Sequence, residues 1–167
     1  MQMEPAIALA RMSEPEAAGR TLMSASRNMW LTGMLAQITA HFGISAPQFI
    51  SEVEGPVRTD SKGERWATYL LDTTMLRQAL DGIARLLALA AERAEEYADL
   101  IGFGCTAEEI AEALDEASAE FDPVQGPSGE EEGDGPLYLF SYLKSLDTVL
   151  QDALAQGLCV IHTRHLY

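Results

Sequence analysis

Apolar residues spaced alternately by three and four recur from Trp66 to Ile101, and this run constrains the fold more than any other feature of the sequence. The positions are Trp66, Tyr69, Thr73, Leu76, Leu80, Ile83, Leu87, Ala90, Ala94, Tyr97 and Ile101, of which only Thr73 is polar. This spacing is the heptad pattern of a helix that packs along its length. The sequence therefore predicts a central helix, roughly 40 Å long from Leu76 to Ile101 at about 1.5 Å per residue.

The start of this helix has two interpretations. Ser61 followed by Glu64 matches a capping box, and Trp66 continues the heptad line, so we favour a helix that begins early. The alternative is a small β-hairpin near 57–71, because its second half is rich in Thr and aromatic residues that favour strands. In that case the helix would begin near Thr74.

Other start and stop signals divide the rest of the chain. Ser13 and Pro15 favour a helix start, and the helix would reach Phe42 and end at Gly43. A second start at Ser45 predicts a short helix that Gly55-Pro56 ends.

Two further helices are predicted in the second half. Thr106 and Glu109 form a capping-box pattern that opens a helix of about four turns, whose apolar face would extend to Phe121. The last helix would run from Pro136 to Gln156, with Gly157 as its stop.

These elements predict a mainly α protein, a bundle-like single domain over residues 1–167 with about four main helices. Residues 1–12 would be a loose N-terminal arm or an edge strand. Residues 122–136 contain many acids, Gly and Pro, and we expect a mobile loop there. The apolar, β-branched start of the segment 158–167 predicts a short C-terminal strand.

The net charge of −15 is concentrated in one segment. Residues 94–143 contain fourteen Asp and Glu and no Lys or Arg, whereas the rest of the chain is nearly balanced. A field of one sign repels nucleic acid and anionic lipid and attracts a basic surface. We therefore expect neither direct nucleic-acid binding nor membrane binding. The plainer interpretation is that these acids only keep a helix face and a loop hydrated.

The favoured functional hypothesis is a non-catalytic protein that binds a basic surface of a protein partner as an inhibitor, in the manner of immunity proteins. Because a capped helix holds its side chains on a rigid frame, the predicted partner-binding residues are Glu108, Glu109, Glu112, Asp115, Glu116 and Glu120. One alternative is a nucleic-acid mimic of the anti-restriction or anti-CRISPR type, and another is an α-helical enzyme or ligand-binding bundle. The sequence is compatible with a homodimer.

Candidate chemistry is sparse. Cys159, His162 and His165 offer zinc donors, but their spacing in an extended tail separates them, so we predict no metal site. His41 near a helix end could accept a phosphoryl group, although an ordinary helix-end histidine is the favoured interpretation. Cys105 precedes a helix start that would favour its thiolate, but Glu108 and Glu109 oppose this.

No cofactor is predicted, because the sequence lacks a phosphate-binding glycine loop and the Glu-x-x-His pairs of di-iron bundles. Whether the protein is an enzyme stays undecided, with the balance against it. The longest apolar run, Leu86 to Ala91, is far shorter than the roughly 20 residues of a membrane span. With two cysteines and no basic, apolar leader, we expect a cytoplasmic protein.

Overall fold

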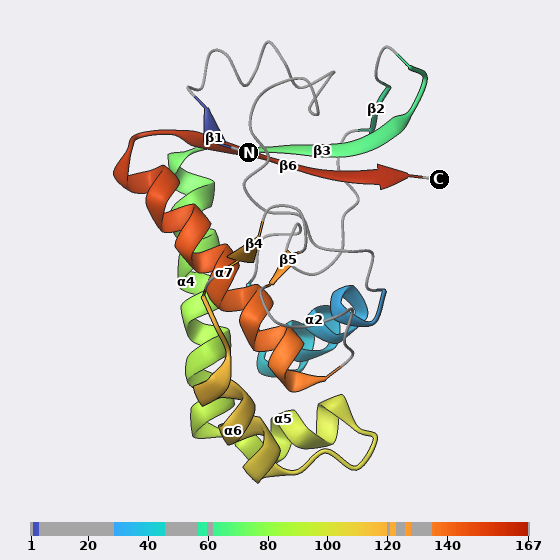
Figure 1. Cartoon of the computed structure of the whole chain (residues 1–167), viewed down its shortest axis with the longest axis vertical. Coiled ribbons are helices and arrows are strands. Elements are labelled where there is room, and N and C mark those ends of the chain that lie inside the picture. The colour runs from blue at the N-terminus through green and yellow to red at the C-terminus, as the bar shows by residue number, and fades with distance from the viewer. Residues whose placement is uncertain are drawn as a thin grey trace.

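The computed structural model describes residues 2–3, 29–45, 57–59, 62–119, 121–122, 126–127 and 135–166. Its helices are α2 (Met29–Phe42), α4 (Thr73–Glu92), α5 (Ala94–Ile101), α6 (Ala107–Glu116) and α7 (Pro136–Ala155). Figure 1 shows a four-stranded sheet at one end of the molecule and α5 and α6 at the other, with α4 and α7 running between them. The predicted mainly α fold with a small hairpin and a C-terminal strand is confirmed.

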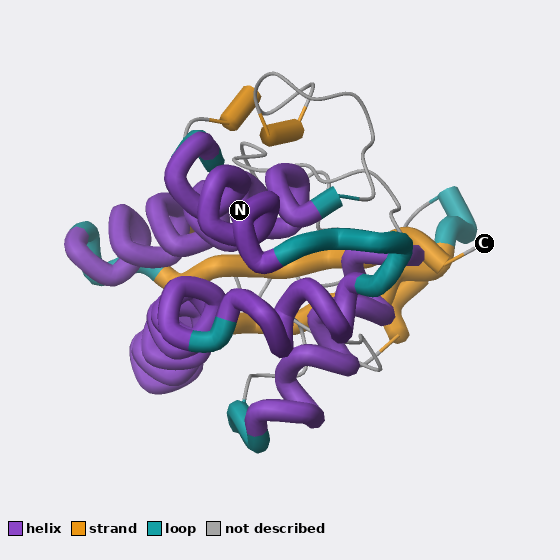
Figure 2. The backbone as a smooth tube through the Cα atoms, turned by 90° about the horizontal axis from the view of Figure 1, so that it is seen from below, coloured by secondary structure: helices purple, strands orange, loops and turns teal. Residues whose placement is uncertain are grey.

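One antiparallel sheet contains the strands β1 (Gln2–Met3), β2 (Val57–Thr59), β3 (Arg65–Leu71) and β6 (Cys159–Leu166) in the order β1-β6-β3-β2. The longest ladder joins β3 to β6, from Arg65 opposite Leu166 to Leu71 opposite Val160. β1 adds Gln2 opposite Val160 on the other side of β6. The C-terminal strand is therefore an inner strand of the sheet. Figure 1 shows the described helices below this sheet, and in the view from below in Figure 2 they lie in front of it.

The favoured helix start at 64–73 is wrong, and the hairpin alternative is correct. Residues Arg65–Leu71 form β3, which pairs with β2 on one edge and with β6 on the other. The Asp72 carboxylate then caps α4 by accepting hydrogen bonds from the backbone N–H groups of Thr74 and Met75, both at 2.9 Å. Pairing with a strand far along the chain thus outweighs the local heptad spacing of Trp66.

The predicted single helix from Leu76 to Ile101 is also wrong, because it breaks at Arg93. Arg93 has φ −137° and ψ 47°, outside the helical region, and it separates α4 from α5. After the break Tyr97 is fully buried, and its hydroxyl donates a 2.6 Å hydrogen bond to the Leu86 carbonyl oxygen. The Tyr97 ring stacks on Phe42 at 5.3 Å between ring centroids. Burial of a paired tyrosine, worth about 2 kcal/mol, accounts for the bend.

The predicted helix stops at Gly43 and Gly157 are confirmed. Gly43 ends α2 with φ +62°, and Gly157 follows α7 with φ +68°. At each end the next residue's N–H bonds back to a carbonyl five residues earlier, as from Ile44 to Thr39 at 2.9 Å. The predicted helix start at Ser13 and the short helix between Ser45 and Gly55 lie outside the described residues.

The acidic helix is shorter than predicted. α6 ends at Glu116 instead of continuing to Phe121, and Phe121 belongs to β4 (Phe121–Asp122), which pairs with β5 (Gly126–Pro127). Part of the expected mobile loop 122–136 therefore lies in a short ladder, and α7 begins at Pro136. Residues 123–125 and 128–134 lie outside the described part of the chain.

One hydrophobic cluster connects the five helices that the structure describes with the sheet. Its largest fully buried side chains are Tyr97, Phe140, Leu35, Ile38, Leu71, Leu76, Ile83, Leu86, Ile110, Leu139, Leu143 and Leu150. The heptad line from Leu76 onward is correct only in part: Leu76, Ile83, Ala90, Tyr97 and Ile101 are buried, whereas Leu80, Leu87 and Ala94 are only partly buried.

Candidate functional site

The acidic helix α6 begins with the predicted capping box. The Thr106 hydroxyl accepts a hydrogen bond from the Glu109 backbone N–H at 3.2 Å, and the Glu109 carboxylate accepts one from the Thr106 backbone N–H at 2.8 Å. Glu108 and Glu109 also lie in the first turn, where the helix dipole favours negative charge. The start of α6 is therefore fixed, and Glu109 contributes to this cap as well as to the acidic surface.

A lysine from α7 fixes the other end of α6. The Lys144 Nζ donates hydrogen bonds to the backbone carbonyl oxygens of Leu114 at 2.6 Å and Ala117 at 3.0 Å. A cation at the C-terminal end of a helix is favoured by the helix dipole. Lys144 is the first basic residue after Arg93, and it therefore marks the end of the acidic segment 94–143. The same residue stabilises the C-terminal end of α6.

The two faces of α6 differ sharply. Ile110 and Ala113 are buried on the inner face, and Ala117 is buried just after the helix. The outward-facing acids are all exposed: Glu108, Glu109, Glu112, Asp115 and Glu116. Positions 108, 112 and 116 are four residues apart, so these carboxylates form one row along the helix surface.

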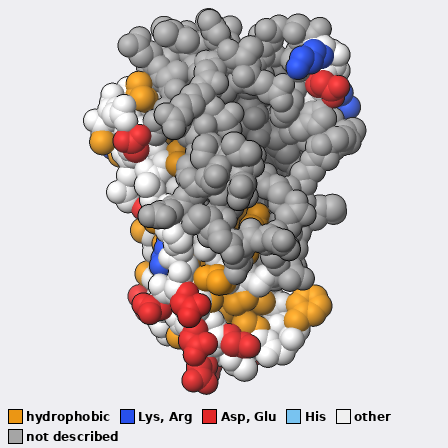
Figure 3. Space-filling model, viewed as in Figure 1, with side chains coloured by type: hydrophobic (Ala, Val, Ile, Leu, Met, Phe, Trp, Pro, Cys, Tyr) orange, Lys and Arg blue, Asp and Glu red, His pale blue; other side chains and the backbone are white. Residues whose placement is uncertain are grey.

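Five of the six predicted partner-binding residues are thus brought together on α6, and the sixth, Glu120, lies outside the described residues. Figure 3 shows acidic side chains gathered at the lower end of the molecule, where Figure 1 places α5 and α6. Within the part of the chain that the structure describes, none of the α6 acids forms an ion pair. We name this group of five side chains the acidic face.

Helix α5 adds acids that the sequence prediction did not include. Glu95 and Asp99 are exposed on it, while Glu96 is engaged by two partners. His41 Nε2 lies 3.1 Å from one Glu96 oxygen, and Arg93 Nε donates to the other at 2.6 Å. The hydrogen bond with His41, followed by the interactions with Arg93, lowers the pKa of Glu96. Its charge is therefore balanced locally, unlike the charges on α6.

His41 and Cys105 are two further candidates for chemistry. His41 stands at the end of α2, and its contacts are Glu96 and an edge-on Phe42 ring at 4.8 Å. Burial and the negative charge of Glu109 raise the pKa of the Cys105 thiol. A raised pKa keeps the thiol protonated at neutral pH, which opposes a role as nucleophile.

The candidate zinc ligands Cys159, His162 and His165 are spaced along the extended strand β6 and do not form a cluster. The strand is extended from Cys159 to Leu166, so positions three residues apart are separated by about 10 Å along it. His162 lies opposite Tyr69 in the ladder and His165 lies opposite Trp66. The described residues contain no group of three or more His, Cys, Asp or Glu side chains placed to hold a metal ion.

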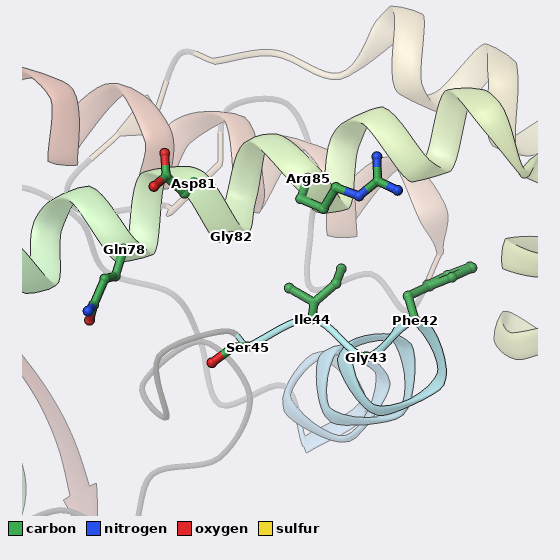
Figure 4. Close-up of a pocket in the computed structure, with 8 residues that line it drawn as sticks. All are labelled: Phe42, Gly43, Ile44, Ser45, Gln78, Asp81, Gly82 and Arg85. Carbon is green, nitrogen blue, oxygen red and sulfur yellow. The ribbon is translucent and has the colours of Figure 1, made fainter.

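An open hollow of about 470 Å³ lies between the end of α2 and the middle of α4. Its lining residues are Phe42, Gly43, Ile44, Ser45, Gln78, Asp81, Gly82 and Arg85. In Figure 4, Phe42 and Ile44 extend from the end of α2 toward α4, while the Asp81 carboxylate points away from the hollow. Arg85 pairs with Glu92 at 3.5 Å. Because the polar groups do not converge, the hollow is a weaker candidate than the acidic face.

The chain matches no protein-family model, no curated protein and no solved structure. Among the helices that the structure describes, none combines the length and apolar character needed to cross a membrane. The geometry of the acidic face is therefore the main indication of function.

Proposed function

We propose that this protein is a non-catalytic binding protein whose acidic face engages a basic surface of a protein partner. One observation carries the proposal: five exposed carboxylates lie on a helix whose two ends are fixed by Thr106 and Lys144. A rigid frame supports binding because little side-chain and backbone entropy is lost when the partner docks. More specifically, we propose that the protein blocks the activity of this partner, as an inhibitor or immunity-type antagonist.

Repulsion between like charges on α6 also favours a role for these acids in binding rather than in folding. Like charges four residues apart, such as Glu108 with Glu112 and Glu112 with Glu116, destabilise a helix by about 0.2 to 0.5 kcal/mol for each pair. A merely hydrated face could mix both signs at no such cost. A basic partner would turn this repulsion into attraction and would speed association through long-range steering.

The nucleic-acid mimic is the weaker candidate, because α6 is short for it. Ten helical residues span about 15 Å, less than half of a DNA helical turn of about 34 Å. The five carboxylates of the acidic face match only the roughly four phosphates that one strand of duplex DNA carries over that length, at one per about 3.4 Å. Competition by duplex DNA for the same partner would be the result that favours mimicry.

The test is a comparative capture from cells of the source organism. The immobilised protein is compared with a variant that carries Glu112→Lys, Asp115→Lys and Glu116→Lys together. Partners held by the acidic face should be retained by the wild type and lost with the variant. With a purified captured partner, the association rate should fall steeply as added salt shortens the screening length from about 10 Å at 0.1 M to about 3 Å at 1 M.

A matched control separates the acidic face from net charge alone. Glu64→Lys, Asp81→Lys and Asp152→Lys together change the net charge equally, and all three residues are exposed away from α6. This control should retain the partners. Equal losses with both triple variants, or a partner whose association ignores salt and both variants, would contradict the proposal.

A further inference from the structure

Phe103 is far more exposed than any other large apolar side chain that the structure describes. It is 96% exposed, and Val57, at 48%, is the other large hydrophobic residue in this class. A single exposed apolar residue is ordinary, but one with almost its whole ring in water gains nothing from the hydrophobic effect. Packing within the fold therefore does not explain a phenylalanine at this position.

The backbone does not favour phenylalanine at position 103 either. Phe103 has φ +55° and lies between Gly102 at +72° and Gly104 at +82°. The Cys105 N–H closes the turn by donating to the Gly102 carbonyl oxygen at 2.9 Å. Central turn residues with positive φ are normally Gly, Asn or Asp, because a larger side chain crowds its own backbone. A strained conformation at an exposed aromatic residue points to a role outside folding.

The turn fixes the backbone of Phe103 close to the start of the acidic face. It joins the end of α5, where the Gly102 N–H bonds to Ala98 at 2.9 Å, to the Thr106 cap of α6. Exposed acids flank it on both sides in the sequence, Asp99 before it and Glu108 after it. An aromatic side chain on a rigid turn, bordered by charge, resembles the anchors that contribute most of the binding energy in protein interfaces.

We propose that Phe103 is the apolar anchor of the binding surface, and that it inserts into an apolar patch framed by Lys and Arg on the partner. This inference rests on the proposed function, since the acidic face selects the basic frame. Charge complementarity also decides against a second copy of this chain as the occupant. Two copies docked through Phe103 would bring two acidic faces together, which like-charge repulsion opposes.

The test uses two synthetic peptides of equal length and equal positive charge. The first contains lysine, with leucines three and four residues apart so that it forms an amphipathic helix. The second has serine in place of each leucine. The wild type should bind the lysine–leucine peptide at least about tenfold more tightly. Phe103→Asn should bind both peptides with affinities within about twofold of each other. Val57→Asn, at the other exposed apolar residue, should keep the full preference.

The outcomes separate the two proposals. If Phe103→Asn keeps the preference for the lysine–leucine peptide, the anchor is overturned while the acidic face stands. If the triple charge-reversal variant binds both peptides as tightly as the wild type does, the acidic face is overturned, and the anchor that rests on it falls as well. A wild type that binds neither peptide overturns both.

Stability and assembly measurements complete the test. Because Asn accepts positive φ more readily than Phe, Phe103→Asn should melt at the same temperature as the wild type or above it. A fall of several degrees would assign Phe103 a structural role and overturn the anchor. Sedimentation should also show no self-association that depends on Phe103, and a dimer lost in Phe103→Asn would identify a second copy as the occupant instead.

Discussion

Helices α4 and α6 both begin with a side-chain cap, but they differ in how much of their support comes from burial. α4 spans twenty residues and buries a full stripe of side chains: Leu76, Ala79, Gly82, Ile83, Leu86, Leu89 and Ala90. α6 spans ten residues and buries Ile110 and Ala113. What α6 lacks in buried area is offset at its ends, by the Thr106 cap and by Lys144 from α7.

This difference shows where the fold can tolerate repulsion between like charges on its surface. A helix held by its packing face needs neighbours along its whole length, so its outer side is set by what surrounds it. A helix held at its ends has an outer side that is free to carry like charges, provided that the caps remain. The acidic face can therefore exist because, apart from Glu109, which also closes the cap, the residues that stabilise α6 are separate from those that carry its charge.

The largest expected effect comes from breaking α4. Ile83→Asp would place a carboxylate at a fully buried position, and the free energy of unfolding should fall by on the order of 3 kcal/mol or more. Leu87→Asp should cost less, because Leu87 is only partly buried. Urea unfolding measures both values.

A control on the same helix is Gln78→Asp, which adds the same charge at an exposed position. Its free energy of unfolding should stay within about 0.5 kcal/mol of the wild type. If Ile83→Asp unfolds like this control, α4 does not owe its stability to its packing face.

A smaller effect is expected from releasing the end of α6. Lys144→Met keeps the apolar stem but removes the donor to the Leu114 and Ala117 carbonyl oxygens, so stability should fall by about 1 to 3 kcal/mol. Hydrogen exchange should show the amides of α6 losing more protection than those of α4. Lys62→Met makes the same replacement at an exposed residue and should leave both helices unchanged. Equal loss in the two helices would mean that α6 has no separate support.

The smallest effect concerns Glu96, which links α5 to the end of α2 through His41. Its lowered pKa means that the folded state favours the charged carboxylate. The stabilising contribution is therefore present above the unfolded pKa and is lost as the pH falls through the folded pKa. Thermal melting of wild type and Glu96→Gln should differ slightly near neutral pH and converge in acid. A difference that grows in acid would contradict this assignment.

Local signals predicted a large part of the fold. The capping box at Thr106, the stops at Gly43 and Gly157, and the buried heptad positions of α4 depend on neighbours in the chain, which a sequence displays directly. The strand Arg65–Leu71 was mistaken for helix because its partner β6 lies far along the chain. The break at Arg93 was missed for a similar reason, since it depends on the contacts of Tyr97 with α2 and α7.

The candidate site was predictable in composition but not in its supports. The acidic row of α6 follows from helical spacing, and five of its residues were identified correctly as neighbours on one helix. The sequence does not reveal that Lys144 contacts the end of α6, because this contact joins two different helices, α7 and α6. Phe103 is not among the predicted site residues, yet a large aromatic residue between two glycines is a signal that the sequence displays.

The central position of β6 has a consequence for synthesis on the ribosome. β3 leaves the ribosome roughly ninety residues before its main partner, which at about 5 to 20 residues per second is a wait of some 4 to 20 seconds. During that time one edge of β3 has open backbone groups that can pair with other nascent chains. Slower translation between α4 and α7 should therefore increase co-translational aggregation, and a lysine substitution on that edge would be expected to suppress it.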